Sequence, residues 1–196
     1  FSSKHVIKPQ VININVMISG LEKILRRVIG ESIDLTTRLG ENVGNVIGDP
    51  AQMEQIILNL MVNSRDAINA NGKISIETAN IDPQQNLEAG RELGLQTPHT
   101  MIAVSDNGCG IDDDTIARIF EPFFTTKEHG KGTGLGLSTV HGIVKQLGGL
   151  IRVESVPGKG TVFKIYLPSV AQAVEEATMA NKVSLTSRAE TILVVE

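Results

Sequence analysis

Three polar residues in the stretch that starts at Pro50 have a spacing that could serve metal chemistry. Asn59, Asn63 and Asp66 follow at intervals of four and three residues, which places them on one face of a helix. Asparagine is a weak helix-interior residue, because its side chain competes for backbone hydrogen bonds. Amide oxygens directed at a hard cation such as Mg²⁺ would explain two of them one turn apart. A solvated face with two incidental asparagines is the alternative.

A second candidate group lies in the segment 104–111, where Asp106 enters a loop that contains Gly108 and Gly110. A carboxylate there could accept a hydrogen bond from the amino group of a base. The glycines would let the backbone approach the ligand closely. Because Asp-Asn-Gly also favours turns, a plain turn is the alternative interpretation.

A third group is the glycine-rich run 130–136, which opens an apparent helix. Free N–H groups at a helix N-terminus attract anions, and glycines let that backbone wrap around phosphates. The run is not a Walker loop, because no Gly-Lys in it is followed by Ser or Thr. It is not a G-x-G-x-x-G dinucleotide motif either, because its glycine spacing differs. Upstream, three of the five phenylalanines fall within 120–124, either as plain core residues or as the base of a mobile lid.

The elements that must position these groups follow from periodicity and from turn residues. Asp49 and Pro50 predict a helix start, and residues 82–99 look like a polar, irregular and mobile insertion. We expect helices over 16–29, 50–69 and 134–147, and strands over 11–14, 32–38, 46–48, 73–80, 100–105, 150–155 and 161–167.

Composition restricts the class of protein. The 196 residues are 41% hydrophobic, which suits one compact domain. Aromatic residues make up 3% and the net charge is -4, so we expect no nucleic-acid partner. The single cysteine, Cys109, fits a reducing compartment and predicts a cytoplasmic location. No apolar run reaches the roughly 20 residues that cross a bilayer, so we expect no membrane contact by this segment, although its parent chain could be membrane-anchored.

The order and spacing of these groups resemble the catalytic domain of sensor histidine kinases, in the superfamily shared with gyrase, the heat-shock-90 chaperones and mismatch-repair ATPases. The segments 59–68, 106–111, 119–127 and 130–149 match the N box, first glycine box, F box and second glycine box of that family. The residues of the F box and of the second glycine box are most similar to those of the nitrogen-regulation subgroup and its hybrid relatives. The resemblance implies an α+β fold: a two-layer α/β sandwich in which a mixed sheet carries three helices on one face, with a mobile ATP lid.

The resemblance also implies ATP and Mg²⁺ as cofactors. Asn63 would hold Mg²⁺ with help from Asn59, and both would count as catalytic. Asp106 would select adenine. The implied nucleotide contacts are Asn63, Asp66, Asp106, Gly108, Gly110, Ile111, Lys127, Lys131, Gly132, Thr133, Gly134, Leu135, Gly136, Leu137 and Thr161.

Hydrolytic members of the superfamily carry a glutamate one turn before the metal asparagine, where this chain has Asn59. We therefore expect transfer of the γ-phosphoryl group to another nucleophile, with a gyrase- or chaperone-type ATPase as the alternative. None of the histidines, His5, His99, His129 and His141, has the sequence context of a phosphoacceptor. The acceptor is expected on a separate dimerisation domain of a homodimeric parent chain.

The ends of the chain suggest neighbouring domains. Residues 1–9 resemble the end of a helical hairpin, 10–168 form the catalytic domain, and 169–189 read as a linker. Residues 190–196 resemble the first strand of a response-regulator receiver domain, with Glu196 as its first acidic metal ligand, although a generic strand would look similar. A hybrid kinase with a receiver partner is expected.

Overall fold

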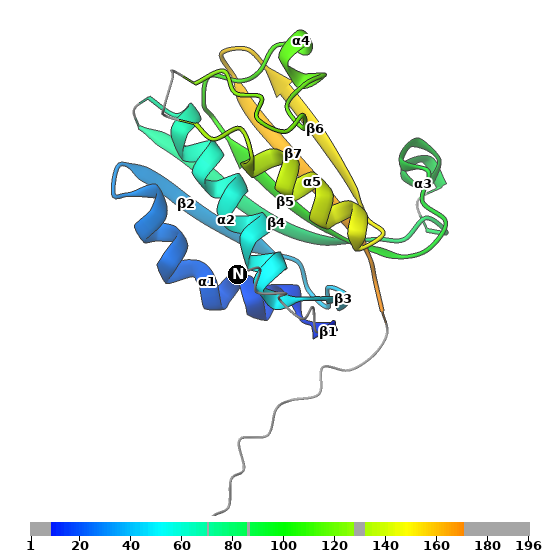
Figure 1. Ribbon diagram of the computed structural model, residues 1–196. Helices are drawn as coiled ribbons and strands as arrows, with labels where there is room; N and C mark the ends of the chain where they lie inside the picture. Colours follow the sequence, from blue (N-terminus) through cyan, green and yellow to red (C-terminus); the bar gives the residue numbers. More distant parts are fainter. Residues whose placement is uncertain (1–8, 70, 86, 128–131, 171–196) are drawn as a thin grey trace, which may run out of the picture.

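The chain folds around a mixed five-stranded sheet with the strand order β2-β4-β5-β7-β6 (Figure 1). A computed structural model describes residues 9–69, 71–85, 87–127 and 132–170. The strands are β2 Ile33–Leu39, β4 Gly72–Ile81, β5 His99–Asp106, β7 Gly160–Pro168 and β6 Leu150–Val156. Only the β2–β4 pair is parallel in this sheet. The prediction of a mixed sheet is confirmed.

Three long helices lie over one face of this sheet (Figure 1). They are α1 Ile14–Ile29, α2 Pro50–Ala67 and α5 Gly136–Gln146. A small antiparallel pair, β1 Gln10–Ile12 and β3 Val46–Gly48, lies beside them, and the short helices α3 Leu87–Leu93 and α4 Asp113–Ile116 lie at the periphery. The predicted two-layer α+β architecture is confirmed.

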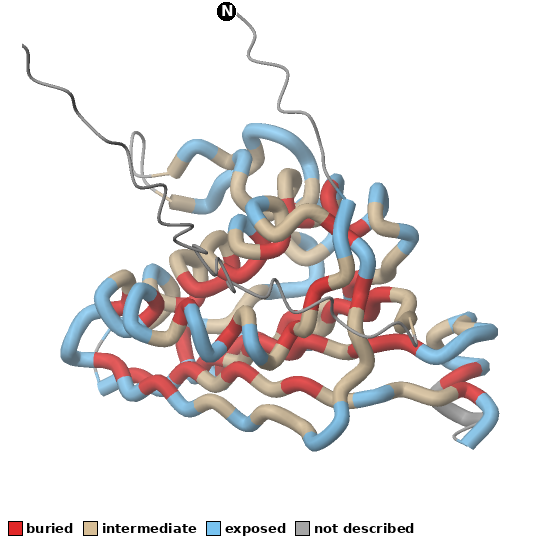
Figure 2. Tube along the Cα trace, turned by 90° about the horizontal axis from the view of Figure 1, so that it is seen from below, coloured by how far each residue is buried: buried red, intermediate tan, exposed pale blue. Residues whose placement is uncertain are grey.

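The hydrophobic core fills the space between the helices and the sheet (Figure 2). Burial of a large aliphatic side chain contributes about 1.5–3 kcal/mol to folding. This layer therefore stabilises the packing of α2 on β4 and β5. The largest fully buried side chains are Ile14, Ile18, Leu25, Met53, Ile56, Ile57, Leu60, Met61, Ile74, Ile76, Ile102 and Ile165.

Two capping side chains decide where the first helices begin. Oδ1 of Asp49 accepts a hydrogen bond from the backbone N–H of Ala51 at 2.9 Å, which starts α2 as predicted. Oδ1 of Asn13 accepts from the N–H of Val16 at 3.0 Å. Because of this second cap, Ile14 belongs to α1, and the prediction that the first strand reaches residue 14 is wrong.

The segment 82–99 is more ordered than its composition suggested. It contains α3, and Gly90 packs so closely that an added Cβ would lie 2.7 Å from Cβ of Pro83. His99 is buried as the first residue of β5, with Nδ1 2.6 Å from the carbonyl oxygen of Thr97. The prediction of an irregular segment is therefore wrong for α3 and for His99.

The described fold continues slightly beyond the predicted boundary at residue 168. The backbone N–H of Ser169 donates to the carbonyl oxygen of Pro98 at 3.0 Å, and that of Val170 donates to the carbonyl oxygen of Asn45 at 2.8 Å. The predicted hairpin end at 1–8, the linker from 171 and the receiver strand at 190–196 lie outside the described residues. No helix in the described ranges has both the length and the apolar character that a membrane span requires.

Candidate functional site

A cavity of about 610 Å³ opens between α2, α5 and the loops that follow β5, a size typical of ligand sites. It brings together residues that are far apart in the sequence. Predicted site residues that line it are Asn59, Asn63, Asp66, Asp106, Gly110, Ile111, Lys127, Gly132, Thr133, Gly134, Gly136, Leu137 and Thr161. Gly108 and Leu135 lie outside this lining, and Lys131 lies outside the described residues.

Asp106 lines the cavity from the last position of β5 and is 7% exposed. Its Oδ1 accepts from the N–H of Gly108 at 2.9 Å, and its Oδ2 accepts from Oγ of Ser64 at 2.9 Å. Burial raises the pKa of Asp106, while the hydrogen bonds from Gly108, Ser64 and the backbone of Thr161 oppose that rise. These bonds fix the carboxylate and leave acceptor capacity for a ligand N–H.

The loop after Asp106 needs glycine at two positions. An added Cβ at Gly108 would lie 2.6 Å from the carbonyl oxygen of Ala67, so this residue packs under α2 rather than facing the cavity. Gly110 has φ +70°, and an added Cβ would lie 2.2 Å from the carbonyl oxygen of Val156. Ile111 follows, and its N–H is fixed by Oγ of Ser155 at 2.8 Å.

Asn59 and Asn63 face the N-terminus of α5 across the cavity. Nδ2 of Asn59 donates to the carbonyl oxygen of Gly136 at 3.3 Å, and its Oδ1 lies 3.9 Å from a Cβ built at Gly136. The side chain of Asn63 has no hydrogen-bond partner within the described ranges, and its Nδ2 lies 3.8 Å from a Cβ built at Gly136. An amide oxygen without a protein donor suits a hard cation. The donor chemistry of this pair therefore fits Mg²⁺.

The glycine run reaches α5 through a backbone that only glycine adopts easily. Gly134 has φ +64°, and an added Cβ would lie 2.3 Å from the carbonyl carbon of Phe123. The N-cap residue of α5, Leu135, makes no side-chain capping bond, and its own side chain is 41% exposed. The first N–H groups of α5 therefore remain available for an anion.

The three phenylalanines of 120–124 have different environments. Phe120 packs on the core and stacks on His141 at 5.0 Å between ring centroids. Phe124 lines the cavity, and the guanidinium of Arg118 lies 4.3 Å from its ring centroid. Phe123 has φ 68° and is 75% exposed. Neither a purely buried cluster nor a purely lid-forming one describes all three.

Asp66, which also lines the cavity, forms ion pairs with Lys127 and Arg65. Its Oδ2 accepts from Nζ of Lys127 at 2.6 Å, and its Oδ1 accepts from Nε of Arg65 at 2.8 Å. Partial burial acts to raise the pKa of Asp66, but the hydrogen bonds from Lys127 and Arg65 outweigh it and hold the pKa below its ordinary value. Asp66 is therefore ionised at neutral pH.

Ser64 and Arg65 also line the cavity, and neither is among the predicted site residues. Ser64 is 1% exposed and orients Asp106, and Arg65 fixes Asp66. The only signal for Ser64 in the sequence is its position next to Asn63 in the predicted helix. Arg65 falls within the segment 59–68 that matches the N box, and that resemblance assigns no role to its side chain.

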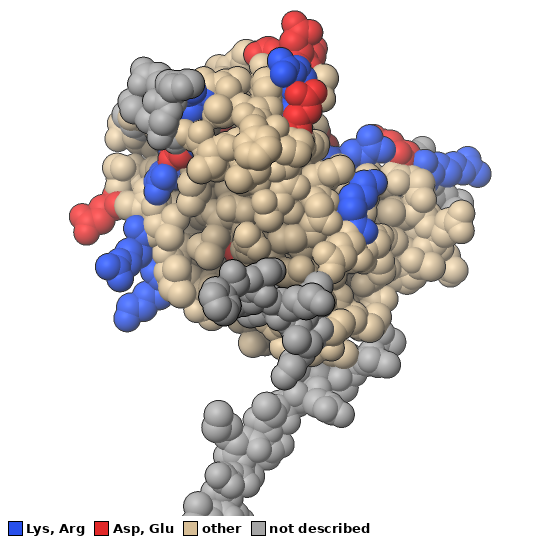
Figure 3. Space-filling model, in the orientation of Figure 1, with Lys and Arg blue, Asp and Glu red and all other residues tan. Residues whose placement is uncertain are grey.

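Figure 3 shows the helix-covered face, where charged side chains stand mainly around the edge and the middle is largely uncharged.

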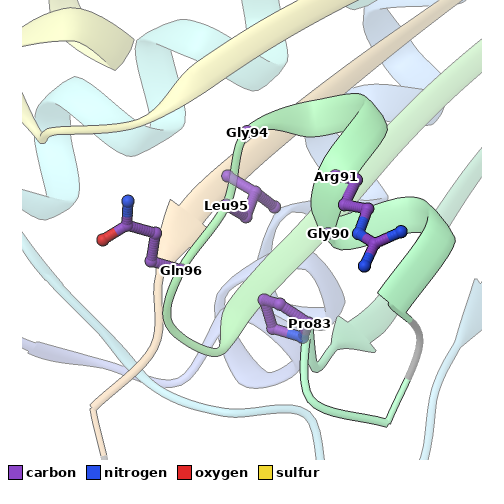
Figure 4. A pocket seen from close by; sticks show the side chains of 6 residues that line it. All are labelled: Pro83, Gly90, Arg91, Gly94, Leu95 and Gln96. Atoms are coloured by element: carbon purple, nitrogen blue, oxygen red, sulfur yellow. The ribbon is translucent and has the colours of Figure 1, made fainter.

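A second cavity of about 290 Å³ lies away from this site, beside α3 (Figure 4). Its lining consists of Pro83, Gly90, Arg91, Gly94, Leu95 and Gln96. It lacks the convergent polar groups that distinguish the larger cavity.

Residues 48–171 match the family model described as histidine kinase-, DNA gyrase B- and HSP90-like ATPase. The chain is 39% identical over 204 residues to "Sensor kinase CckA" of Brucella abortus, a match that covers 100% of this chain and 22% of that protein. It is 37% identical over 164 residues to "Sensor histidine kinase ZraS" of Salmonella typhimurium, covering 83% of this chain and 32% of that protein. The chain thus spans between a fifth and a third of these relatives.

Solved structures with a similar fold include the mycobacterial sensor histidine kinase MprB. That comparison has a TM-score of 0.63 and 26% sequence identity, and covers 84% of this chain and 98% of the other. The catalytic domain of histidine kinase ThkA gives a TM-score of 0.63 with 28% identity, over 83% of this chain and 96% of the other.

Proposed function

Because this chain belongs to the family of histidine kinase-, DNA gyrase B- and HSP90-like ATPases, we propose that it binds Mg²⁺-ATP and transfers the γ-phosphoryl group to a histidine. Its relatives by name are sensor histidine kinases, and the chain is the ATPase-type domain of such a two-component sensor kinase. The acceptor histidine would lie on a dimerisation and phosphoacceptor domain of the parent chain.

The observation that carries the proposal is that one 610 Å³ cavity contains two different kinds of polar group. The buried acceptor Asp106 matches the exocyclic amino group of adenine. Asn63 and the uncapped N-terminus of α5 match a metal ion and phosphates. A nucleotide is the ligand class that needs both kinds of group at once.

The metal ion and the phosphates would be held by residues of this chain. Bound Mg²⁺ would supply positive charge to the phosphates, and Asn63 would hold it with the help of Asn59. Gly132, Thr133, Gly134 and Gly136 would bring backbone N–H groups to the phosphate oxygens, and Lys127 would add a cation. Such positioning and charge neutralisation are the main needs of phosphoryl transfer.

Transfer rather than hydrolysis is supported by Asn59. Its amide donates to the carbonyl of Gly136, and an amide has no basic group that could take a proton from water. A neutral imidazole needs only to be positioned. The described histidines do not qualify as acceptors, because His99 is buried in β5 and His141 stacks on Phe120.

The parent chain would be a homodimeric cytoplasmic kinase or a membrane-anchored one, with a receiver domain after a linker that follows residue 170. The match to Sensor kinase CckA covers 100% of this chain, so it includes 190–196. The hybrid arrangement rests on the resemblance of 190–196 to the first strand of a receiver domain.

The test mixes this chain, Mg²⁺-ATP and a separately made phosphoacceptor hairpin from the parent. We expect acid-labile, alkali-stable phosphate on the hairpin alone, at a rate that rises with concentration because the tether is absent. Phosphate on this chain, or hydrolysis that outpaces transfer, would favour an ATPase of the gyrase or chaperone type.

A further inference from the structure

Lys127 lines the cavity, and its ammonium group is bound by Asp66 of α2. Nζ of Lys127 donates to Oδ2 of Asp66 at 2.6 Å, across 61 positions of sequence. The two side chains are 32% and 24% exposed. The contact is therefore partly shielded from solvent, and it ties the end of the F-box segment to α2.

Arg65 holds Asp66 from its other side. Nε and Nη2 of Arg65 donate to Oδ1 of Asp66 at 2.8 and 2.6 Å, and Nη1 donates to the carbonyl oxygen of Val28 at 3.1 Å. The rigid planar guanidinium fixes this geometry better than a lysine could. One carboxylate oxygen is thus occupied by Arg65, and the other is turned toward Lys127.

The aliphatic part of Lys127 lies against the glycine run. A Cβ built at Gly132 would lie 3.3 Å from Cδ of Lys127 and 2.6 Å from Oγ1 of Thr125. Lys127 therefore bridges α2 and the segment that would surround phosphates. Two cations on one carboxylate leave one net positive charge at this place, which suits a phosphate group.

We propose that Asp66 is a positioning residue that holds the ammonium group of Lys127 beside the glycine run, where the phosphates would lie, and does not itself bind the nucleotide. This inference rests on the proposed binding of Mg²⁺-ATP. It departs from the expectation, drawn from the family resemblance, that Asp66 contacts ATP directly.

The test is a double-mutant cycle with Asp66→Asn and Lys127→Met, a pair that together restores the net charge of the wild type. Affinity for the Mg²⁺ complex of a non-hydrolysable ATP analogue is measured by calorimetry. We expect Lys127→Met to weaken binding about ten-fold or more. Asp66→Asn should weaken it about two- to five-fold, as expected of a partly exposed ion pair. Added to Lys127→Met, Asp66→Asn should cause no further loss, since nothing remains to be positioned.

Glu77→Gln is the matched control, because it breaks the Arg38–Glu77 ion pair at 2.8 Å on the sheet with the same change of charge. It should leave the affinity unchanged. An equal loss from Asp66→Asn in both backgrounds would mean that Asp66 contacts the nucleotide, and tighter binding would mean that it opposes the phosphates. Either result overturns the proposal.

A second measurement separates this inference from the proposed function. Backbone hydrogen exchange over 123–127 in the nucleotide-free chain should accelerate in each single variant, and no further in the double variant. Unchanged exchange in Asp66→Asn would show that Asp66 does not hold Lys127. Failure of the wild type to bind the ATP analogue would instead refute the proposed function.

Discussion

Replacement of Asp106 by asparagine separates nucleotide recognition from stability more cleanly than any other change in this site. The carboxylate has Gly108 N–H on Oδ1 and the Ser64 hydroxyl on Oδ2, each at 2.9 Å. An asparagine can keep its oxygen on Gly108 and donate its amide N–H to Oγ of Ser64, because a hydroxyl can also accept. The local structure should therefore survive the substitution.

The loss in nucleotide binding follows from the charge that disappears. A hydrogen bond from the adenine amino group to a carboxylate contributes about 1.5–3 kcal/mol, which corresponds to a roughly 10- to 150-fold loss of ATP affinity. In the Asp106→Asn variant the atom that replaces Oδ2 is a donor, which faces the amino group of adenine unfavourably but suits the carbonyl group of guanine. The preference for ATP over GTP should collapse or reverse.

The effect on stability should have the opposite sign. Burial raises the pKa of Asp106 above its ordinary value of 3.8, so the folded state of the wild type binds more protons than the unfolded state as the pH rises through this window. Stability of the wild type therefore falls as the pH rises from 3.8 through the raised pKa. Asp106→Asn lacks this dependence and should be at least as stable at pH 7, with an advantage that shrinks on acidification.

Both effects can be measured on the same protein samples. Calorimetric titration with ATP and GTP gives the affinity ratio, and urea unfolding between pH 4 and pH 8 gives the stability difference. Asp34→Asn, at an exposed position of β2, is the control for a simple change of charge. An unchanged ATP to GTP ratio, or a variant that loses stability steadily as the pH rises relative to wild type, would refute the role assigned to Asp106.

Two further substitutions, one of them with a control, test the metal-binding role of Asn63 and the backbone of the glycine run. Asn63→Ala should weaken nucleotide binding only when Mg²⁺ is present, because an amide oxygen ligand is lost; equal losses with and without metal in calorimetry would contradict this. Gly134→Ala should destabilise the fold by about 1–3 kcal/mol in urea unfolding, because φ is +64° and the new Cβ would meet the backbone of Phe123 at 2.3 Å. Gly142→Ala, at an open position in α5, should instead stabilise by about 0.5–1 kcal/mol, and similar effects at both positions would disprove the steric argument.

Local sequence signals predicted the elements that depend on neighbouring residues. The Asp49-Pro50 pair located the start of α2 at the observed residue, and the asparagine spacing placed Asn59 and Asn63 on the side of α2 that lines the cavity. The prediction of a strand over 11–14 is wrong at Asn13, which is the N-cap of α1. The same approach also failed at α3, because a short helix stabilised by packing on Pro83 leaves little periodicity.

The sequence by itself determined which residue types stand at each helical face and loop, because side-chain periodicity and backbone preference are local properties. It could not show that Ser64 donates to Asp106 or that Lys127 donates to Asp66, 42 and 61 positions away. Those contacts exist because α2 packs over β5 and because the segment 123–127 returns to the edge of α2. Only the packing of the two layers brings such residues within 3 Å of each other, and that distance decides whether a carboxylate meets a hydroxyl, a cation or solvent.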